Sequence, residues 1–260
     1  MNNILIHLPS DKRLVWYLAA EEYFAKNIHL LNQTYTKGIQ HAEDHLEELD
    51  GILFTWIVPP TVIFGRHQVM ENEVNVDFCL QNNIAMYRRK SGGGCVYADE
   101  GNLMISYIAP SSHSEQVFQS YLDMMCYTLS QLGYDAVKST HNDIMIGEHK
   151  VSGNACFALP SATIVHGTML YDVNFEMLQL AITPSKEKLA KHGVESVRQR
   201  VMNIKDIATT NTHDISSTQA LAHKIESILC SASYSATDED LCAIDKIEQE
   251  YLDPTFISRL

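Results

Sequence analysis

The chain contains the stretch Arg88-Arg89-Lys90-Ser91-Gly92-Gly93-Gly94-Cys95-Val96, in which three cations run into three consecutive glycines. Glycine has no Cβ, so its backbone N–H groups can approach a ligand closely and can adopt positive φ. Neighbouring arginines offer planar donor forks that suit phosphate or carboxylate. The stretch predicts an anion-binding loop, with a nucleotide as the leading ligand, although a solvated basic turn has the same composition. It matches neither common glycine-rich nucleotide motif.

The residues on either side of the glycines predict how the loop is held. An apolar strand is expected over 84–89, and a second over 95–97, followed by a polar turn at 99–101 and a strand over 102–109. The triple glycine therefore joins two strands rather than a strand and a helix. Anion binding there would depend on loop N–H groups and not on a helix dipole.

Outward from this loop, the pattern predicts paired strands with flanking helices. Helices are expected from about residue 10 to 27 and over 72–82, 116–132, 184–191, 218–230 and 238–251, and strands over 52–58, 61–64 and 162–173, with a hairpin over 143–153. This order favours an α+β fold with mixed or antiparallel sheets flanked by helices, rather than a regular βαβ series. We expect one domain over 1–207 and a short helical extension over 208–260 packed on it.

Composition narrows the class of protein. The formal net charge of −13 argues against a general nucleic-acid binder, because phosphate backbones need a basic face. The N-terminus lacks the basic region and apolar run of a signal peptide, and no run approaches a membrane span, so a cytoplasmic protein with no membrane partner is expected. Six scattered cysteines without a C-x-x-C pair favour buried thiols over zinc ligands or disulfides.

Further motifs along the chain match a known family. The glycine stretch together with Asp99, 101–103 and Ser106 resembles the signature loop of lipoate–protein ligases. Residues 142–144 and 147–155 resemble the catalytic-lysine hairpin of that family. Residues 65–68 with 73–75, 166–170 and 196–203 are similar to its other motifs. The matches are colinear across 50–207, and they imply a biotin/lipoate protein ligase-like catalytic domain.

The resemblance implies a reaction in two steps. Members of the family activate lipoate with ATP and Mg²⁺ to lipoyl-AMP, and then pass the acyl group to a lysine of an acceptor protein. The acceptors would be lipoyl domains of 2-oxoacid dehydrogenase complexes and the glycine cleavage H protein. Both steps build negative charge on an oxygen, so fixed donors aimed at that oxygen lower the barrier.

The resemblance also implies which residues form the site, with Lys150 as the catalytic residue. Lipoate would contact Lys150, His166 and Gly167, and Asp143 is a candidate Mg²⁺ ligand. The residues expected to bind ATP or lipoyl-AMP are Arg89, Ser91, Gly93, Gly94, Cys95, Val96, Tyr97, Asn102, Asp143, Lys150, Ser152, Gly153 and Ala155.

Lys150 is expected to act as an electrostatic clamp between the acyl carbonyl and the α-phosphate. An acyl-lysine amide is too stable to pass its group onward, so nucleophilic attack by Lys150 would end turnover. Strand alternation predicts that Lys150, Ser152 and Asn154 share one face of their strand. Asp143 on the partner strand would orient Lys150 or hold Mg²⁺. His166 also has a structural interpretation, as a buried histidine that packs under the site.

Alternatives remain open on the sequence alone. Cys95 or Cys156 could carry an ATP-independent lipoyl or octanoyl transfer, which needs an activated, accessible thiol. A non-catalytic ligand-binding module is a third option. Ligases of this type carry a C-terminal accessory domain, and only about 50 residues follow the 196–203 motif, so a separate accessory polypeptide is also an option. Arg88 and Lys90 are hypothesised to form a cationic patch that docks an acidic acceptor.

Overall fold

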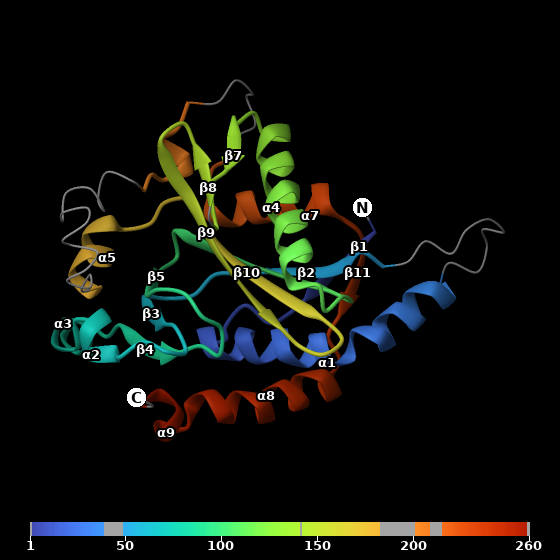
Figure 1. Cartoon of the computed structure of the whole chain (residues 1–260), viewed down its shortest axis with the longest axis horizontal. Helices are drawn as coiled ribbons and strands as arrows, with labels where there is room; N and C mark the ends of the chain where they lie inside the picture. Colours follow the sequence, from blue (N-terminus) through green and yellow to red (C-terminus); the bar gives the residue numbers. More distant parts are fainter. Residues whose placement is uncertain (1, 39–48, 141, 183–200, 209–214, 259–260) are drawn as a thin grey trace.

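Two β-sheets and the helices around them make up the computed structural model (Figure 1). It describes residues 2–38, 49–140, 142–182, 201–208 and 215–258, with the backbone alone for 32–38. An eight-stranded mixed sheet has the strand order β11-β1-β2-β6-β10-β9-β8-β7, and a three-stranded sheet has the order β4-β3-β5. The strands are β1 (Asn3–His7), β2 (Gly51–Trp56), β3 (Thr61–Phe64), β4 (Ala85–Arg88), β5 (Val96–Ala98), β6 (Asn102–Ala109), β7 (Ala136–Lys138), β8 (Asp143–Ile146), β9 (His149–Ala158), β10 (Thr163–Leu170) and β11 (Cys230–Ser235). The expected α+β class is confirmed.

Helices cover both faces of the large sheet. The helical elements are α1 (Leu14–Gly38), α2 (Met70–Glu73), α3 (Val76–Gln81), α4 (Ser114–Gln131), α5 (Phe175–Ala181), the 3₁₀ turn η1 (Ile204–Asp206), α7 (Thr218–Leu229), α8 (Asp238–Leu252) and α9 (Pro254–Ile257). On one face, α1 and α8 pack against each other and against Phe54 and Ile108 of the sheet. On the other face, α4 and α7 pack against Leu53 and Ile105. Because side chains alternate along a strand, odd and even positions of β2 and β6 enter different cores.

The glycine stretch lies where the two sheets meet. Strand β3 pairs in parallel with β4, which enters the stretch, and antiparallel with β5, which leaves it. The triple glycine therefore joins two strands of the small sheet, as the sequence predicts. The eight residues of β6 have the expected bounds and are all buried, so the loop rests on a rigid frame.

Several predicted boundaries are wrong for identifiable reasons. The single helix expected over 72–82 is two helices, because Val74 forms a β-bridge with Ile182 and the Asn75 side chain caps α3. The first helix begins at Leu14 and runs beyond the expected end near 27. The helix expected over 184–191 lies outside the described residues. No helix among the described residues is long and apolar enough to cross a membrane.

The C-terminal stretch contributes more than the helices expected of it. Its residues 230–235 form β11, which pairs in parallel with β1 at the edge of the large sheet. Every second residue of β11 is exposed, and such an edge strand carries little of the apolar signal by which strands are predicted. Leu221 and Ile244 lie in the two cores on either side of that sheet. The division at 207/208 stays an interpretation of the sequence.

Candidate active site

Arg89 braces the glycine loop from inside. Its Nη2 donates to the carbonyls of Gly92 (2.7 Å) and Gly94 (2.6 Å), and its Nε lies 3.1 Å from both the Gly92 carbonyl and Ser91 Oγ. Burial lowers the pKa of Arg89 to about 10. No carboxylate of the described residues lies within ion-pair distance of the guanidinium. The loop therefore encloses a cation without a counter-ion, an arrangement that favours an incoming anion.

The loop conformation depends on two glycines. Gly93 has φ +93°, a value that L side chains rarely adopt. A Cβ at Gly65 would lie 2.2 Å from the Gly93 carbonyl oxygen, so the end of β3 must be glycine to let the loop approach. Arg66 N donates to the Ser91 carbonyl at 3.0 Å and closes the same contact. The loop is thus fastened to the small sheet at its base.

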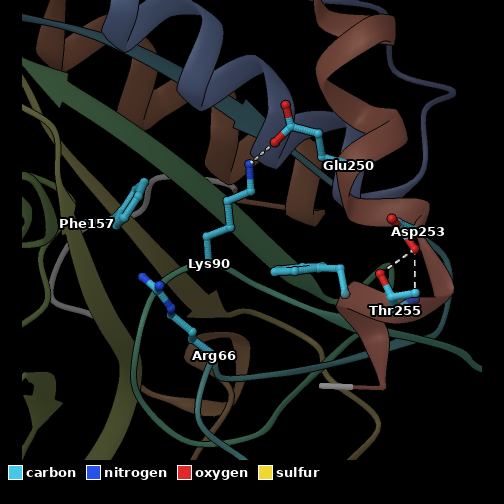
Figure 2. Close-up of a pocket in the computed structure, with 7 residues that line it drawn as sticks. Arg66, Lys90, Phe157, Glu250, Asp253 and Thr255 are labelled. Atoms are coloured by element: carbon cyan, nitrogen blue, oxygen red, sulfur yellow. Dashed lines mark hydrogen bonds and ion pairs between the residues drawn. The ribbon is translucent and has the colours of Figure 1, made fainter. Parts of the chain in front are cut away.

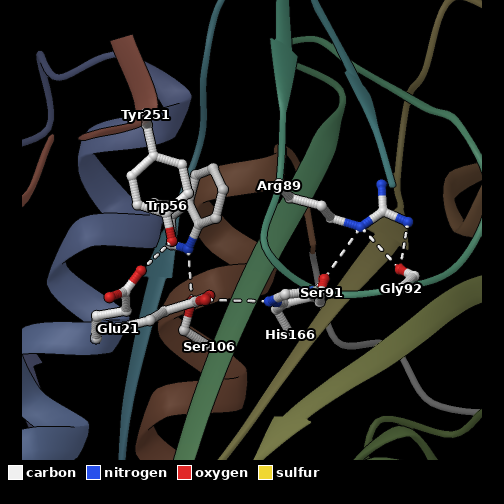
Figure 3. A network of polar contacts seen from close by, with 9 residues as sticks. Glu21, Trp56, Arg89, Ser91, Gly92, Ser106, His166 and Tyr251 are labelled. Atoms are coloured by element: carbon white, nitrogen blue, oxygen red, sulfur yellow. Dashed lines mark hydrogen bonds and ion pairs between the residues drawn. The ribbon is translucent and has the colours of Figure 1, made fainter. Parts of the chain in front are cut away.

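Ser91 fastens the other side of the loop to β10. Its Oγ lies 2.8 Å from His166 Nε2, and His166 Nδ1 lies 3.0 Å from Glu21 Oε2 on α1 (Figure 3). The His166 side chain lies on the α1 face of the large sheet, because its neighbour Val165 enters the core under α4 and α7 on the other face. Ser91 and Glu21 contact His166 on that α1 face. The glycine loop and the sheet therefore meet at His166.

A β-bulge sets the direction of Lys150. Lys150 pairs with Met145 and Ser152 pairs with Ile144, so Val151 is an extra residue in β9. The Lys150 tip lies over Gly153, where a Cβ would be only 2.8 Å from Nζ. The prediction that Lys150 shares a face with Ser152 and Asn154 is wrong, because the bulge interrupts the alternation on which it depends.

The Lys150 ammonium and backbone are both held. Its Nζ lies 2.6 Å from Asp143 Oδ1 on β8. Its carbonyl accepts from Met202 N at 3.1 Å, and Lys150 forms a parallel bridge with Val201. The expected 196–203 motif therefore reaches the lysine strand through its last residues, while 196–200 lie outside the described part of the chain.

The loop and the lysine converge on one short segment of β10. His166 and Thr168 are two residues apart, a spacing of about 7 Å on one strand face. His166 contacts Ser91 of the loop, and Thr168 Oγ1 accepts from Gly153 N at 3.1 Å, directly beneath the Lys150 tip. A basic glycine-rich loop and a fixed lysine thus face the same space.

A search by sequence finds the family of this architecture. Residues 18–226 match the family described as the lipoyl protein ligase A/B catalytic domain. The chain belongs to this family. It is 34% identical over 168 residues to lipoate-protein ligase LplJ of Bacillus subtilis, covering 64% of this chain and 51% of that protein. It is 30% identical over 234 residues to lipoate–protein ligase 1 of Staphylococcus aureus, covering 90% and 66%. The chain thus spans about half to two thirds of the length of these two relatives.

Solved structures share the fold. A bi-partite lipoate protein ligase from Thermoplasma acidophilum superposes with a TM-score of 0.75 at 24% identity, over 99% of this chain and 96% of that one. A lipoate-protein ligase A bound with ATP gives 0.74 at 24% identity over the full length of both chains. The expected lipoyl-ligase fold is confirmed.

The other predicted ligand-binding residues fall into two groups within the lipoyl ligase fold. Ala155 is two residues from Gly153 on β9 and shares its face, toward the loop. Ser152 and Asn154 are buried and hydrogen-bonded to each other on the opposite face, and a Cβ at Gly167 would meet Asn154 Oδ1 and Tyr121 of α4 there. The second group follows the loop. Cys95 and Val96 are half-buried where the loop enters β5, and Tyr97 of β5 and Asn102 of β6 are buried. Their roles in binding ATP or lipoate stay predictions.

Arg88 and Lys90 do not form the docking patch that the sequence suggests. Arg88 is 2% exposed, and its guanidinium donates to the carbonyls of Gln68 and Ile257. The Lys90 side chain is 20% exposed and is paired with Glu22 at 2.7 Å and Glu250 at 2.8 Å. Both cations bond the loop to the helices around it. Their acceptors are distant in the sequence, and only the fold brings them near. The hypothesis of a cationic docking surface at these residues is wrong.

A cavity of about 380 Å³ lies beside Lys90, between β9 and the C-terminal helices (Figure 2). Arg66, Phe157 and Phe256 line it with Lys90. Phe157 is two residues beyond Ala155 on β9, so the cavity lies on the same strand face as Gly153 and Ala155. The space in front of the loop therefore continues toward α9.

Cysteine chemistry is disfavoured by the surroundings of Cys156. Burial raises the pKa of its thiol, and its side chain packs against the core under α4 and α7, away from the loop. A thiol with a raised pKa forms little thiolate at neutral pH. Cys156 therefore lacks the position and the activation that an acyl-carrying nucleophile needs.

Sequence reasoning missed Glu21. This residue is 3% exposed, bonded to His166, and accepts a hydrogen bond from Ser106 Oγ at 2.6 Å. A signal was available, because Glu21 follows Leu14 and Leu18 at helical spacing on the stripe that faces the core. A carboxylate at such a position indicates a buried polar network.

Proposed function

We propose that this chain acts as an ATP-dependent lipoate–protein ligase. It would activate lipoate as lipoyl-AMP with release of pyrophosphate, and then transfer the lipoyl group to a lysine of an acceptor domain. Membership of the lipoyl protein ligase family supports the reaction class. The observation that carries the proposal is the convergence of the glycine loop and Lys150 on His166 and Thr168 of β10.

Arg89 and the loop would hold the nucleotide phosphate. Arg89 is buried, has its pKa lowered by burial, and lacks a carboxylate partner among the described residues. An anion in the loop would offset the cost of burying this charge. The site therefore fits a phosphate group, and binding would leave the loop carbonyls still bonded to the guanidinium.

Lys150 would stabilise the negative charge that develops between the acyl carbonyl and the α-phosphate. Fixed donors aimed at a developing oxyanion lower the barrier without needing to reorganise during the reaction. Asp143, at 2.6 Å, holds the ammonium in place. A clamp of this kind acts in both steps, because negative charge develops at the α-phosphate in the first and at the acyl carbonyl in the second.

Mg²⁺ would arrive with the nucleotide. The described residues contain no group of three or more His, Cys, Asp or Glu side chains that could hold a metal ion. Mg²⁺ in such sites takes one or two carboxylates together with phosphate oxygens. Asp143 would be the protein ligand, and the ion would neutralise phosphate charge.

Lipoyl domains are the proposed acceptors, and a separate accessory polypeptide is a proposed requirement for adenylation. The Thermoplasma acidophilum relative is described as bi-partite and together with an E2 lipoyl domain, and the two chains match over almost their full lengths. A partner would then supply what the longer curated relatives carry in one chain.

The test separates the two steps. The purified chain is incubated with lipoate, ATP, Mg²⁺ and an apo acceptor domain, and acceptor mass and AMP release are followed. A second reaction supplies preformed lipoyl-AMP in place of lipoate and ATP. Acceptor modification in both supports a ligase that works alone and refutes the requirement for an accessory polypeptide. Modification only from lipoyl-AMP supports a partner for adenylation.

Lys150→Ala and Lys138→Ala form the matched pair of variants. Lys138 lies on the edge strand β7, which β8 separates from the strand of Lys150, and it is paired with Asp123 at the surface. K138A should therefore keep wild-type activity. K150A should lose at least about 100-fold, the usual cost of removing one oxyanion donor. An unmodified acceptor in every reaction, or a fully active K150A, would refute the proposal.

A further inference from the structure

A continuous chain of hydrogen bonds runs through the protein beneath the glycine loop (Figure 3). Trp56 Nε1 lies 2.9 Å from Ser106 Oγ, and Ser106 Oγ lies 2.6 Å from Glu21 Oε1. The second oxygen of Glu21 bonds His166, which bonds Ser91. Trp56, Ser106 and His166 come from three neighbouring strands, at positions that share the α1 face. Glu21 comes from α1 and Ser91 from the glycine loop, so three strands, one helix and the loop together form this network of hydrogen bonds.

The donors at the two ends of this network allow one consistent direction for every hydrogen in it. An indole N–H only donates, so Ser106 accepts from Trp56 and gives its own hydrogen to Glu21. An ionised Glu21 only accepts, so His166 Nδ1 carries a hydrogen toward it. Arg89 Nε only donates, so Ser91 accepts from Arg89 and keeps its own hydrogen, which it can give to His166 Nε2. With these directions His166 would be a neutral imidazole that accepts from the Ser91 hydroxyl at Nε2.

Ser91 keeps one acceptor site for a substrate. A hydroxyl oxygen has two lone pairs and one hydrogen, and Arg89 and His166 use one lone pair and the hydrogen. The neighbouring Gly92 is exposed, and no atom lies within 4 Å of the position that a Cβ would take there. Ser91 itself is only 3% exposed, and the His166 side chain is 13% exposed. A substrate would therefore reach Ser91 Oγ from the open side of the loop at Gly92, with His166 and Glu21 behind it.

The proposed transfer step needs a base. The side chain of an acceptor lysine has a pKa of about 10.4 and is almost fully protonated at neutral pH. It must lose a proton before its nitrogen can attack the acyl carbonyl. Lys150 cannot accept that proton while it is an ammonium paired with Asp143. A neutral imidazole at His166 would be a base of the required kind.

We propose that Ser91, His166 and Glu21 form a proton relay that deprotonates the acceptor lysine in the transfer step, an inference that rests on the proposed ligase function. The lysine ammonium gives a proton to Ser91 Oγ as Ser91 passes its own to His166 Nε2. The amine nitrogen then bonds the acyl carbon and the bond to the AMP phosphate breaks. The departing phosphate takes the second nitrogen proton, and the imidazolium releases the first to water. Glu21 stabilises the imidazolium as a positioning residue, as an acid does in Ser-His-acid triads.

Glu21→Gln tests the relay, and Glu22→Gln is its matched control. Glu22 is the next residue on α1 and is 4% exposed, but it bonds Tyr251 and Lys90 instead of His166. Each variant is given preformed lipoyl-AMP and an apo acceptor domain, and transfer is followed in single turnover. E21Q should slow transfer between about 10²- and 10⁴-fold, the range for losing a general base or its orienting acid. Binding of lipoyl-AMP is measured in parallel by titration.

A second nucleophile separates a relay from a structural role. Hydroxylamine is unprotonated at neutral pH, so its attack on protein-bound lipoyl-AMP needs no base for this first proton. Relative to wild type, and after subtraction of the reaction without protein, E21Q should be much less impaired with hydroxylamine than with the lysine acceptor. E22Q should show the same ratio of the two rates as wild type.

The outcomes are distinct. Equal impairment of E21Q with both nucleophiles, or an E21Q transfer rate equal to that of wild type, would overturn the relay. A wild-type chain that cannot transfer from lipoyl-AMP at all would instead overturn the proposed function. E21Q that still binds lipoyl-AMP and melts as a folded protein, yet fails only with the lysine acceptor, supports the relay.

Discussion

Gly153→Ala tests whether the position of the Lys150 ammonium controls the reaction. An added Cβ would lie 2.8 Å from Lys150 Nζ and 3.0 Å from its Cε. Ordinary contact begins near 3.4 Å, so Nζ must move by at least about 0.6 Å. The atoms in the way are the far end of a flexible side chain, and Gly153 does not have a positive φ. The substitution should therefore displace the lysine without breaking the strand.

The expected loss of activity is larger than the loss of stability. A misplacement of 1 Å in a reacting group costs about 10²-fold in rate, so a shift of roughly 0.6 Å predicts a decrease of 10- to 100-fold in kcat. Alanine also removes about 0.4–1 kcal/mol of unfolded-state entropy, which offsets the crowding. The free energy of unfolding should change by less than about 1 kcal/mol.

Gly167→Ala is the contrasting variant. Its Cβ would meet Asn154 Oδ1 at 2.1 Å and the Tyr121 hydroxyl at 2.6 Å, on the face away from Lys150. Overpacking of this kind costs about 1–3 kcal/mol, so G167A should lose stability. Lipoyl-AMP formation, transfer and urea unfolding are measured for both variants. A folded G153A with the wild-type kcat would refute the placement of Lys150 at the reaction centre.

Three shorter predictions follow from other contacts. Arg88→Met should lower the free energy of unfolding in urea by about 3 kcal/mol or more, because buried carbonyls such as that of Gln68 lose their donor. A change below about 0.5 kcal/mol is typical of a surface residue and would contradict a structural role for Arg88. Burial raises the pKa of Cys156, so its alkylation should be slow at neutral pH and accelerate only above the pH at which ordinary thiols ionise. Cys242 is exposed and should react at once. Peptide mass mapping of the alkylated protein across pH tests this. AMP at 100 times its Kd should stabilise the protein by about 2.7 kcal/mol in thermal melts, and Arg89→Met should abolish the shift.

Strong local patterns predict their elements correctly. The β6 strand has the bounds expected from the sequence, because an unbroken apolar run between two turns has few alternatives. Residues 230–235, in contrast, follow a predicted helix without a strand signal, although they form β11. Their alternating, weakly apolar side chains become a strand only because β1 offers a partner. The split between α2 and α3 likewise needs Ile182, which is distant in the sequence and bridges Val74.

Motif chemistry points to the site, but contacts between distant segments decide its geometry. The residue types of the glycine stretch and of the Lys150 hairpin indicate an anion loop and a clamp, because glycine N–H groups and cationic side chains are the donors that an anion needs. The direction of Lys150 is not predictable from alternation, since one extra residue in β9 turns its side chain to the other face. Arg88 and Lys90 have the composition of surface cations, and only the packing of the α1, α8 and α9 segments supplies the acceptors that bury or pair them.

The chemical character of this protein is readable in its local sequence, whereas the partners of its charged groups are not. Residue types and spacing are local properties, so the acyl-adenylate family and the anion loop can be recognised from them. Glu21 and His166 are 145 residues apart in the sequence. Their contact exists because α1 packs on the face of the large sheet that carries His166 of β10. Ser91 contacts His166 because the loop that follows β4 of the small sheet reaches the same strand. Hydrogen bonds of this kind depend on three-dimensional distance, so only the tertiary structure could assemble the relay.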